Sequence, residues 1–272
     1  MITFPACKIN IGLNIISKRS DGFHSIETVF YPIQWADILE IVPGAQESNT
    51  VDFRSTGLRL FGPKDKNLCL RAYQLLSEKF NIPSVKMHLH KVLPIGAGLG
   101  GGSSDAASTL MLLNKIFKLG ASEEELESIA ASIGSDCSFF IRNKPMMATG
   151  KGEILKPISL KLKNYFIVIV KPRAHISTAE AYASVKPSKP KFDLSEQIQR
   201  PISEWKDFVV NDFEHTIFEK HPGIKNIKNK MYKLGALYAS MSGSGSSVYG
   251  IFSNEKNLSA YFRSCTVWQG YL

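Results

Sequence analysis

The fold is decided by residues 94–108, which read Pro94-Ile95-Gly96-Ala97-Gly98-Leu99-Gly100-Gly101-Gly102-Ser103-Ser104-Asp105-Ala106-Ala107-Ser108. Glycines bury no side chain, and they are used where the backbone takes a positive φ or comes close to a ligand. Residues 105–117 contain no Gly or Pro and predict a helix, with Ser103 and Ser104 as N-caps. A glycine-rich loop that leads into a helix N-terminus favours anions, because free N–H groups and the helix dipole meet there. A mobile surface loop is the alternative interpretation.

Two common phosphate-binding motifs fit this loop poorly. A P-loop requires Lys-Ser or Lys-Thr after the glycines, and neither follows here. The spacing of Gly96, Gly98 and Gly101 matches the dinucleotide fingerprint, but that motif requires a second strand after the helix. Ser122 and Glu125 have the spacing of a capping box, so they predict a second helix instead.

The segments around the loop predict an α+β chain. Alternating or β-branched apolar residues predict strands at the start of 3–16 and at 25–33, 37–42, 51–56, 85–90, 165–170 and 248–252. Residues 146–158 carry a turn at Thr149-Gly150-Lys151-Gly152. Helices are expected at 67–80, capped by Asn67, and over most of 202–233, with a break at Pro222-Gly223. Residues 134–141 are expected to turn into a strand, and a helix and a strand to close the chain. A composition shift after Gly152 predicts two domains, 1–153 and 154–272.

The composition is that of a globular protein, with 272 residues of which 44% are hydrophobic and 21% charged. No apolar run is long enough to span a bilayer, and the N-terminus lacks a signal-like segment, so we expect a cytoplasmic protein without a membrane partner. The four cysteines are scattered, which predicts free thiols and neither a zinc site nor a disulfide framework.

The net charge of +9 indicates either nucleic-acid binding or polyanionic ligands. Lysines and arginines are spread along the chain, with a mild cluster between Lys220 and Lys233 that we interpret as a solvated helix face. Nucleic-acid modules carry a basic arm or interleaved aromatic and basic residues, and neither is present. Phosphorylated small molecules are therefore the simpler explanation, and no nucleic-acid partner is expected.

Phosphoryl transfer needs a phosphate cradle, a positive charge near the transferred group and a residue that orients the acceptor hydroxyl. Lys8 and Asp136 are candidates for the last two parts. Strand alternation places Lys8 and Asn10 on one face. From the residues alone, Lys8 as a surface residue and Asp136 as a turn or cap residue stay open.

The loop, with its leading Pro and trailing Ser-Ser-Asp-Ala-Ala, resembles the ATP-phosphate loop of the GHMP small-molecule kinases. The whole chain resembles one branch of that superfamily, whose members phosphorylate a cytidine-diphosphate-linked tetraol in the non-mevalonate isoprenoid pathway. The matching motifs occur in the order of that branch and are Pro5-Ala6-Cys7-Lys8-Ile9-Asn10, Arg19-x-Asp21-Gly22-Phe23-His24, Asn67-Leu68-x-x-Arg71-Ala72, Gly134-Ser135-Asp136-Cys137, Ile176-Ser177-Thr178, Asn211-Asp212-Phe213-Glu214 and Met241-Ser242-Gly243-Ser244-Gly245-Ser246. Sister kinases lack the Asp-Gly-Tyr/Phe-His turn.

The resemblance implies a two-domain α+β fold. The N-terminal half would be an ATP-binding and catalytic domain of the ribosomal-protein-S5-like class. The C-terminal half would be a substrate-binding, ferredoxin-like α/β sandwich, and its second Gly/Ser loop would pack against the site. The expected protein is an ATP-dependent kinase acting on the 2-hydroxyl of the cytidine-diphosphate-linked tetraol, as a monomer or weak homodimer. Another small-molecule kinase of the superfamily is the close alternative, and a non-catalytic nucleic-acid-binding module a remote one.

The resemblance also implies residue roles. Asp136 would take the proton of the acceptor hydroxyl, and Lys8 would polarise that hydroxyl and keep Asp136 ionised. Residues 94–104 would bind the ATP phosphates through backbone N–H groups, with Mg²⁺ arriving with ATP and contacting Ser103 or Ser104. Asn10 would position the substrate.

The cytosine ring would lie near His24 between two aromatic side chains. The first is Phe23, where the family usually has Tyr, and the second is Tyr182. The other interpretation of Tyr182 is a core or helix-surface tyrosine.

Overall fold

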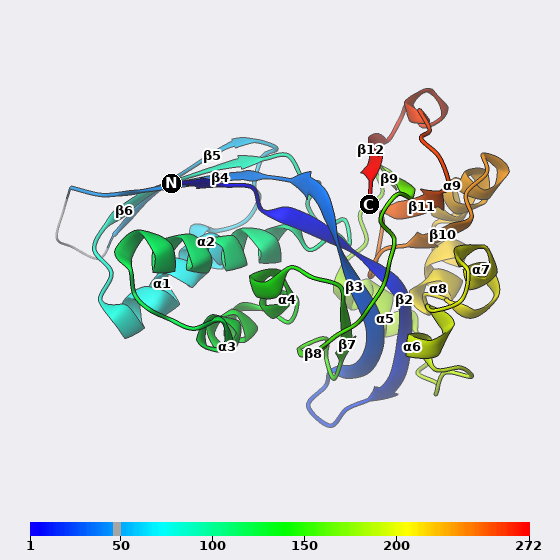
Figure 1. The fold of residues 1–272 in the computed structure, drawn as a ribbon, viewed down its shortest axis with the longest axis horizontal. Coiled ribbons are helices and arrows are strands. Elements are labelled where there is room, and N and C mark those ends of the chain that lie inside the picture. The colour runs from blue at the N-terminus through cyan, green and yellow to red at the C-terminus, as the bar shows by residue number, and fades with distance from the viewer. Residues whose placement is uncertain (46–49) are drawn as a thin grey trace. The chain divides into compact units, whose positions relative to one another are not determined.

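The computed structural model describes residues 1–45 and 50–272, in which groups of strands are followed by groups of helices along the chain (Figure 1). Two compact units share the chain discontinuously. The first unit comprises residues 1–7, 35–95 and 100–144, and the second unit comprises residues 8–34, 96–99 and 145–272. The long hairpin over residues 8–34 therefore belongs with the C-terminal part, whereas the predicted domains meet at one boundary after residue 153. Those domains, with their assigned roles, stay a prediction.

The sheet of the first unit has the strand order β1 (Ile2–Thr3), β4 (Ile38–Pro43), β6 (Val85–Lys91) and β5 (Val51–Gly57). β4 pairs with β6 antiparallel, and β5 is an edge strand that pairs with β6 in parallel. Figure 1 shows α1 (Leu68–Phe80) and α2 (Gly101–Phe117) lying side by side against one face of this sheet. The strand-to-helix path from β6 to α2 carries the glycine-rich loop.

Two helix starts of the first unit confirm the capping predictions. The side chain of Asn67 accepts hydrogen bonds from the N–H groups of Cys69 and Leu70, at 2.9 and 3.3 Å, and starts α1. Ser122 Oγ accepts from the N–H of Glu125 at 3.2 Å and starts α3 (Glu123–Ile133). Local side-chain-to-backbone bonds of this kind are set by neighbouring residues, so the sequence predicts them well.

The predicted start of α2 was wrong. The helix begins at Gly101, and Gly100 occupies the N-cap position with φ of 70°, so Ser103 and Ser104 lie within the first turn. Glycine adopts this left-handed conformation without the steric penalty of a Cβ. The helix therefore begins three or four residues earlier than capping by Ser103 or Ser104 would place it.

Residues 134–141 were predicted to form a turn and then a strand, and this was also wrong. They include most of a short helix, α4 (Cys137–Arg142), in which Phe139 and Phe140 are buried. A short apolar run does not distinguish a buried strand from a buried helix. The final predicted helix is only a 3₁₀ turn, η3 (Ser259–Tyr261), before β12 (Thr266–Tyr271).

One sheet, lying mainly in the second unit, begins with β2 (Ala6–Lys18) and β3 (His24–Ala36), joined by the predicted Asp21-Gly22 turn. β7 (Met146–Thr149) and β8 (Ile154–Pro157) extend it in the order β2-β3-β7-β8. The first residues of β2 and the last of β3 are counted with the first unit.

The other sheet of the second unit has the order β10 (Tyr238–Met241), β11 (Val248–Phe252), β9 (Phe166–Lys171) and β12, with all neighbours antiparallel. β9 lies between two strands and its residues Phe166 to Val170 are buried, as its continuous apolar sequence predicted.

The helices of this unit are α5 (Thr178–Ser184), α6 (Leu194–Gln197), the 3₁₀ turn η2 (Ile202–Glu204), α7 (Trp205–Phe208), α8 (Phe213–Lys220) and α9 (Pro222–Lys233). The predicted break before α9 is confirmed, and Pro222 takes the first helical turn. Within the described residues, no helix is long and apolar enough to cross a membrane.

Candidate functional site

The N-terminus of α2 presents backbone N–H groups in the first unit. The hydrogen-bonded ladder of α2 begins with the N–H of Ser104, which donates to the carbonyl of Gly100 at 2.9 Å, so the N–H groups of residues 101–103 precede it. Such groups, at the positive end of the helix dipole, suit phosphate oxygens. Ser104 is buried and Ser103 half-buried in the same turn. Their hydroxyl oxygens are hard ligands of the kind that Mg²⁺ takes, so the residues fit the ion expected there.

The middle of the glycine-rich loop lies in the second unit and packs on the second Gly/Ser loop. Ser242 Oγ donates to the carbonyl of Gly98 at 2.8 Å, and the N–H of Ser247 donates to the carbonyl of Ala97 at 3.2 Å. Gly98 has φ of +74°, and a Cβ there would lie 2.0 Å from the Ser242 carbonyl oxygen. The contact therefore requires glycine at this position. The predicted packing of the second loop on the first is confirmed.

Lys8 is buried, with 3% of its surface exposed, so the surface interpretation of this lysine is wrong. Its Nζ donates to Asn10 Oδ1 at 2.5 Å and lies 4.5 Å from the centre of the Phe30 ring. Asn10 is held in turn, because its Nδ2 donates to Thr28 Oγ1 at 3.0 Å and its N–H to Ser242 Oγ at 3.2 Å. Removing an ammonium group from water is costly, which makes this lysine a functional candidate.

Asp136 lies in the first unit, directly before α4, and is half-buried. Its backbone already has helical angles, with φ of −84° and ψ of −12°, and within the described chain its side chain makes no capping hydrogen bond to α4. The capping interpretation therefore has no support from the geometry. Lys8 belongs to the second unit and Asp136 to the first.

The structure adds residues that the sequence analysis did not select as site residues. Asn211 donates from Nδ2 to the carbonyls of Met241 and Gly243, at 2.8 and 2.9 Å, and so fixes the second Gly/Ser loop. His175 lies against the first loop, since a Cβ on Gly96 would be 2.6 Å from His175 Cε1. The motif that contains Asn211 is visible in the sequence, but the hydrogen bonds by which Asn211 fixes the second Gly/Ser loop are visible only in the structure.

The predicted cytosine residues lie in the second unit. His24 stacks on Tyr182 with ring centres 4.8 Å apart and an interplanar angle of 22°, and Phe213 meets Tyr182 edge-on at 4.9 Å. Partial burial, followed by the charge of Lys18, lowers the pKa of His24, which favours the neutral ring. Phe23 is 57% exposed, and the ammonium group of Lys151 lies 4.8 Å from its ring centre. The structure thus brings His24 and Tyr182 together and leaves much of Phe23 open to solvent.

The basic residues between Lys220 and Lys233 do not form one solvated face. Lys228 Nζ bonds the buried carboxylate of Glu214 at 2.5 Å. Lys220 and Lys230 instead line a cavity of about 740 Å³ at the start of α9, and Lys230 Nζ donates to the carbonyl of Tyr261 at 2.7 Å. The solvated-face interpretation is therefore wrong for Lys228, which neutralises an internal carboxylate.

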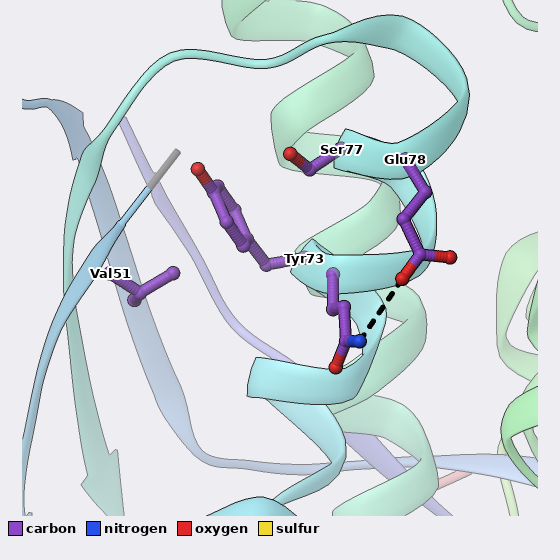
Figure 2. Close-up of a pocket in the computed structure, with 5 residues that line it drawn as sticks. Val51, Tyr73, Ser77 and Glu78 are labelled. Carbon is purple, nitrogen blue, oxygen red and sulfur yellow. Dashed lines mark hydrogen bonds between the residues drawn. The ribbon is translucent and has the colours of Figure 1, made fainter. Parts of the chain in front are cut away.

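A smaller cavity of about 330 Å³ lies beside α1 in the first unit, lined by Val51, Tyr73, Gln74, Ser77 and Glu78 (Figure 2). Gln74 and Glu78 are joined across one helical turn by a hydrogen bond of 3.0 Å. Its lining contains none of the predicted site residues, and the loop-to-α2 junction remains the candidate site of this unit.

Comparison with known proteins shows two matches to family models. The model described as GHMP kinases N terminal domain matches residues 67–144, which include the glycine-rich loop and Asp136. The model described as GHMP kinases C terminal matches residues 196–264, which include the second Gly/Ser loop.

Whole-chain relatives agree with these matches. The chain is 49% identical over 274 residues to the 4-diphosphocytidyl-2-C-methyl-D-erythritol kinase of Parabacteroides distasonis, covering 100% of both chains. It is 50% identical to the protein of the same name from Bacteroides thetaiotaomicron, covering 95% of this chain and 94% of that one.

Solved structures give the same fold. A crystal structure of 4-(cytidine 5'-diphospho)-2C-methyl-D-erythritol kinase superposes with a TM-score of 0.85 at 29% identity and covers 99% of this chain and 98% of that chain. The Methanococcus jannaschii mevalonate kinase superposes with a TM-score of 0.72 at 15% identity, covering 99% and 97%, which indicates a shared fold.

Proposed function

Because this chain belongs to the GHMP kinases, and within them to the 4-diphosphocytidyl-2-C-methyl-D-erythritol kinases, we propose that it phosphorylates the 2-hydroxyl of 4-(cytidine 5'-diphospho)-2-C-methyl-D-erythritol with ATP. The observation that carries this function is near-half identity over the full length of relatives that bear this name. The reaction belongs to the non-mevalonate route to isoprenoid precursors.

A coupled assay for ADP release tests this function. We expect turnover with ATP and the cytidine-diphosphate-linked substrate, and none above background with mevalonate or homoserine under the same conditions. Turnover with mevalonate or homoserine but not with the cytidylylated substrate would assign the chain to another branch of the superfamily. The cytoplasmic location and the monomeric or weakly dimeric state stay predictions.

In the proposed mechanism the acceptor hydroxyl loses its proton to the carboxylate of Asp136 while its oxygen bonds to the γ-phosphorus of ATP. The bond from that phosphorus to the β,γ-bridging oxygen breaks, and ADP leaves. Lys8 polarises the acceptor oxygen as the proton leaves. Burial of Lys8 against Asn10 supports this role, because a fixed cation in a dry site stabilises developing negative charge strongly.

The ATP phosphates occupy the loop of residues 94–104, and the N–H groups that precede the α2 ladder bind their oxygens. The hydroxyl of Ser103 or Ser104 would hold the Mg²⁺ that accompanies ATP, and the ion would supply positive charge to neutralise the phosphates. Support for the cradle comes from glycines in left-handed conformations at positions 96, 98 and 100, which allow the backbone to turn toward a ligand without side chains in the way.

We also assign the two halves to the S5-like and ferredoxin-like classes expected from the family. The C-terminal sheet supports the second assignment. Its chain order is β9, helices, β10, β11, a 3₁₀ turn and β12, and its spatial order is β10-β11-β9-β12. This is the βαββαβ arrangement of antiparallel strands found in ferredoxin-like domains, with the second helix reduced to one turn.

Tyr182 is proposed to stack on the cytosine ring. We expect Tyr182→Ala to raise the KM for the cytidylylated substrate about tenfold or more, because stacking on a base is worth roughly 1–3 kcal/mol. The KM for ATP should stay nearly unchanged. Steady-state kinetics with each substrate varied in turn measures both. Tyr182→Phe is the matched control, since it keeps the ring and loses only the hydroxyl, and its KM should stay near wild type.

Phe23 is proposed as the second stacking side chain, and Phe23→Ala should act in the same direction. Phe23→Tyr, which restores the residue usual in the family, should bind the substrate at least as well as wild type. A folded Tyr182→Ala variant with an unchanged substrate KM would show that the tyrosine belongs to the core cluster around Phe213 and not to the binding site.

A further inference from the structure

A buried charge cluster lies beneath the loop-to-α2 junction, entirely within the first unit. Lys91 Nζ, at the end of β6, lies 2.5 Å from Asp37 Oδ2 and 2.6 Å from Asp105 Oδ2. The exposed fractions are 4% for Lys91, 0% for Asp37 and 3% for Asp105. Buried ion pairs often add little net stability, because desolvation offsets their attraction. The stability of the fold is therefore a weak explanation for three charged groups at this place.

The cluster holds both ends of the glycine-rich loop. Asp37 Oδ1 accepts the N–H groups of Val92 and Leu93, at 2.6 and 2.7 Å, directly before the loop begins at residue 94. Asp105 follows directly after the loop ends at residue 104. Lys91 pairs with both carboxylates, so one ammonium group links the residues before the loop to the residue that follows it.

The same ammonium group lies against the first turn of α2. A Cβ added to Gly101 would be 3.2 Å from Lys91 Nζ and 3.2 Å from Leu93 Cδ1. Within the described chain, α2 has no side-chain hydrogen bond at its N-cap. The ion pair of Lys91 and Asp105 therefore lies directly against the turn that carries the N-terminal N–H groups.

A loop so rich in glycine gains much conformational entropy when it is unrestrained. If only a fraction of the molecules hold the phosphate-binding conformation, the apparent dissociation constant rises by the inverse of that fraction. A restraint at both ends of the loop raises this fraction without touching the ligand.

We propose that Lys91, held between Asp37 and Asp105, is a positioning residue that clamps the phosphate loop in its ATP-binding conformation and thereby sets the affinity for ATP. The proposal rests on the proposed function through the assignment of residues 94–104 to the ATP phosphates. Lys91 acts through the backbone of the loop and makes no contact with the reacting atoms.

The clamp needs one acceptor oxygen from Asp105 and not its charge. Asp105 Oδ2 accepts from Lys91, whereas Oδ1 is buried and has no hydrogen-bond partner among the described residues. An asparagine side chain offers one acceptor oxygen in the same place. An alanine offers none, although its helix propensity is higher.

The test compares Asp105→Asn with Asp105→Ala, two neutral variants that differ in the acceptor. We expect Asp105→Ala to raise the KM for ATP about tenfold or more, as when the competent fraction of the loop falls to about a tenth. Asp105→Asn should stay near wild type. The KM for the cytidylylated substrate, and kcat at saturating ATP, should be unchanged in both, because the clamp acts on the ATP loop alone. Equal KM values for ATP in the two folded variants would overturn the proposal.

Lys91→Met provides a second measurement and should raise the KM for ATP at least as much as Asp105→Ala. It leaves two carboxylates facing each other in the interior, which is strongly destabilising, so a thermal melt is needed beside the kinetics. A folded Lys91→Met enzyme with wild-type KM for ATP would also overturn the proposal.

Gly100→Val separates this proposal from the function on which it rests. If Gly100→Val weakens ATP binding while Asp105→Ala does not, the loop binds the phosphates and the clamp is wrong. If Gly100→Val leaves ATP binding unchanged, the cradle assignment itself is wrong, and the clamp proposal is overturned with it.

Discussion

Replacement of Asp136 by Asn is expected to lower kcat by about 10²–10⁴-fold, the usual contribution of a positioned general base. Asn keeps the size and the hydrogen-bonding capacity of the side chain, but it cannot accept the proton of the acceptor hydroxyl. The KM values for ATP and for the cytidylylated substrate should therefore change little. The expected loss is large because the hydroxyl has a pKa far above neutrality and is a poor nucleophile without assistance.

Lys8→Met should cause a loss of similar size by removing a fixed positive charge beside the transferred phosphoryl group. Methionine suits the buried position of Lys8 and its packing on Phe30. Because the two groups act as a unit, the double variant should be far less impaired than the product of the single losses. Lys86→Met is the control, since this lysine is exposed on β6 and its loss changes only the overall charge.

Steady-state kinetics on the single and double variants, with a thermal melt of each, decides between mechanisms. A near-normal kcat for Asp136→Asn would make Asp136 a turn residue and place the base elsewhere. Losses that multiply in the double variant would mean that Lys8 and Asp136 act independently.

Gly100→Val is expected to abolish most ATP binding. Gly100 occupies the N-cap position of α2 with φ of 70°, a conformation in which a β-branched residue is an outlier. Valine would therefore shift the loop and also place its side chain where the N–H groups meet the phosphates. A rise of about a hundredfold in the KM for ATP corresponds to roughly 2.8 kcal/mol, within reach of losing two charge-assisted hydrogen bonds.

Gly120→Val is a matched control for the strain. Gly120 has φ of +71°, and a Cβ there would meet nothing within 4 Å. Both variants should lose stability through the same backbone conformation, but only Gly100→Val should lose ATP affinity. Calorimetric titration with ATP and a thermal melt of both proteins separate the two effects. Similar ATP affinities in the two folded variants would contradict the cradle.

Features set by neighbouring residues were predicted well from the sequence. The Asn67 and Ser122 caps, the Asp21-Gly22 turn and the break at Pro222 all depend on side chains within a few positions of the backbone they influence. The alternating strand β6 follows from a burial pattern of period two. These signals place the glycine-rich loop between a strand and a helix without knowledge of the tertiary structure.

Features set by tertiary contacts were predicted poorly. The helix α4 forms where a short apolar run is compatible with either secondary structure. Strand alternation did not distinguish a buried Lys8 from an exposed one, because both faces of β2 are covered near that residue. The cluster of Asp37, Lys91 and Asp105 joins positions 54 and 14 residues apart, and no local pattern links them.

The stacking of His24 on Tyr182 has a consequence for the energetics of substrate binding. A flat, partly buried imidazole already covers one face of the Tyr182 ring, and a cytosine that stacks on this face must displace it. An incoming pyrimidine would exchange one ring contact for another and would dehydrate little new apolar surface. Dehydration of apolar surface produces the negative heat-capacity change of binding. The enthalpy of binding the base would then be nearly independent of temperature, with selectivity decided by which ring fits the tyrosine better.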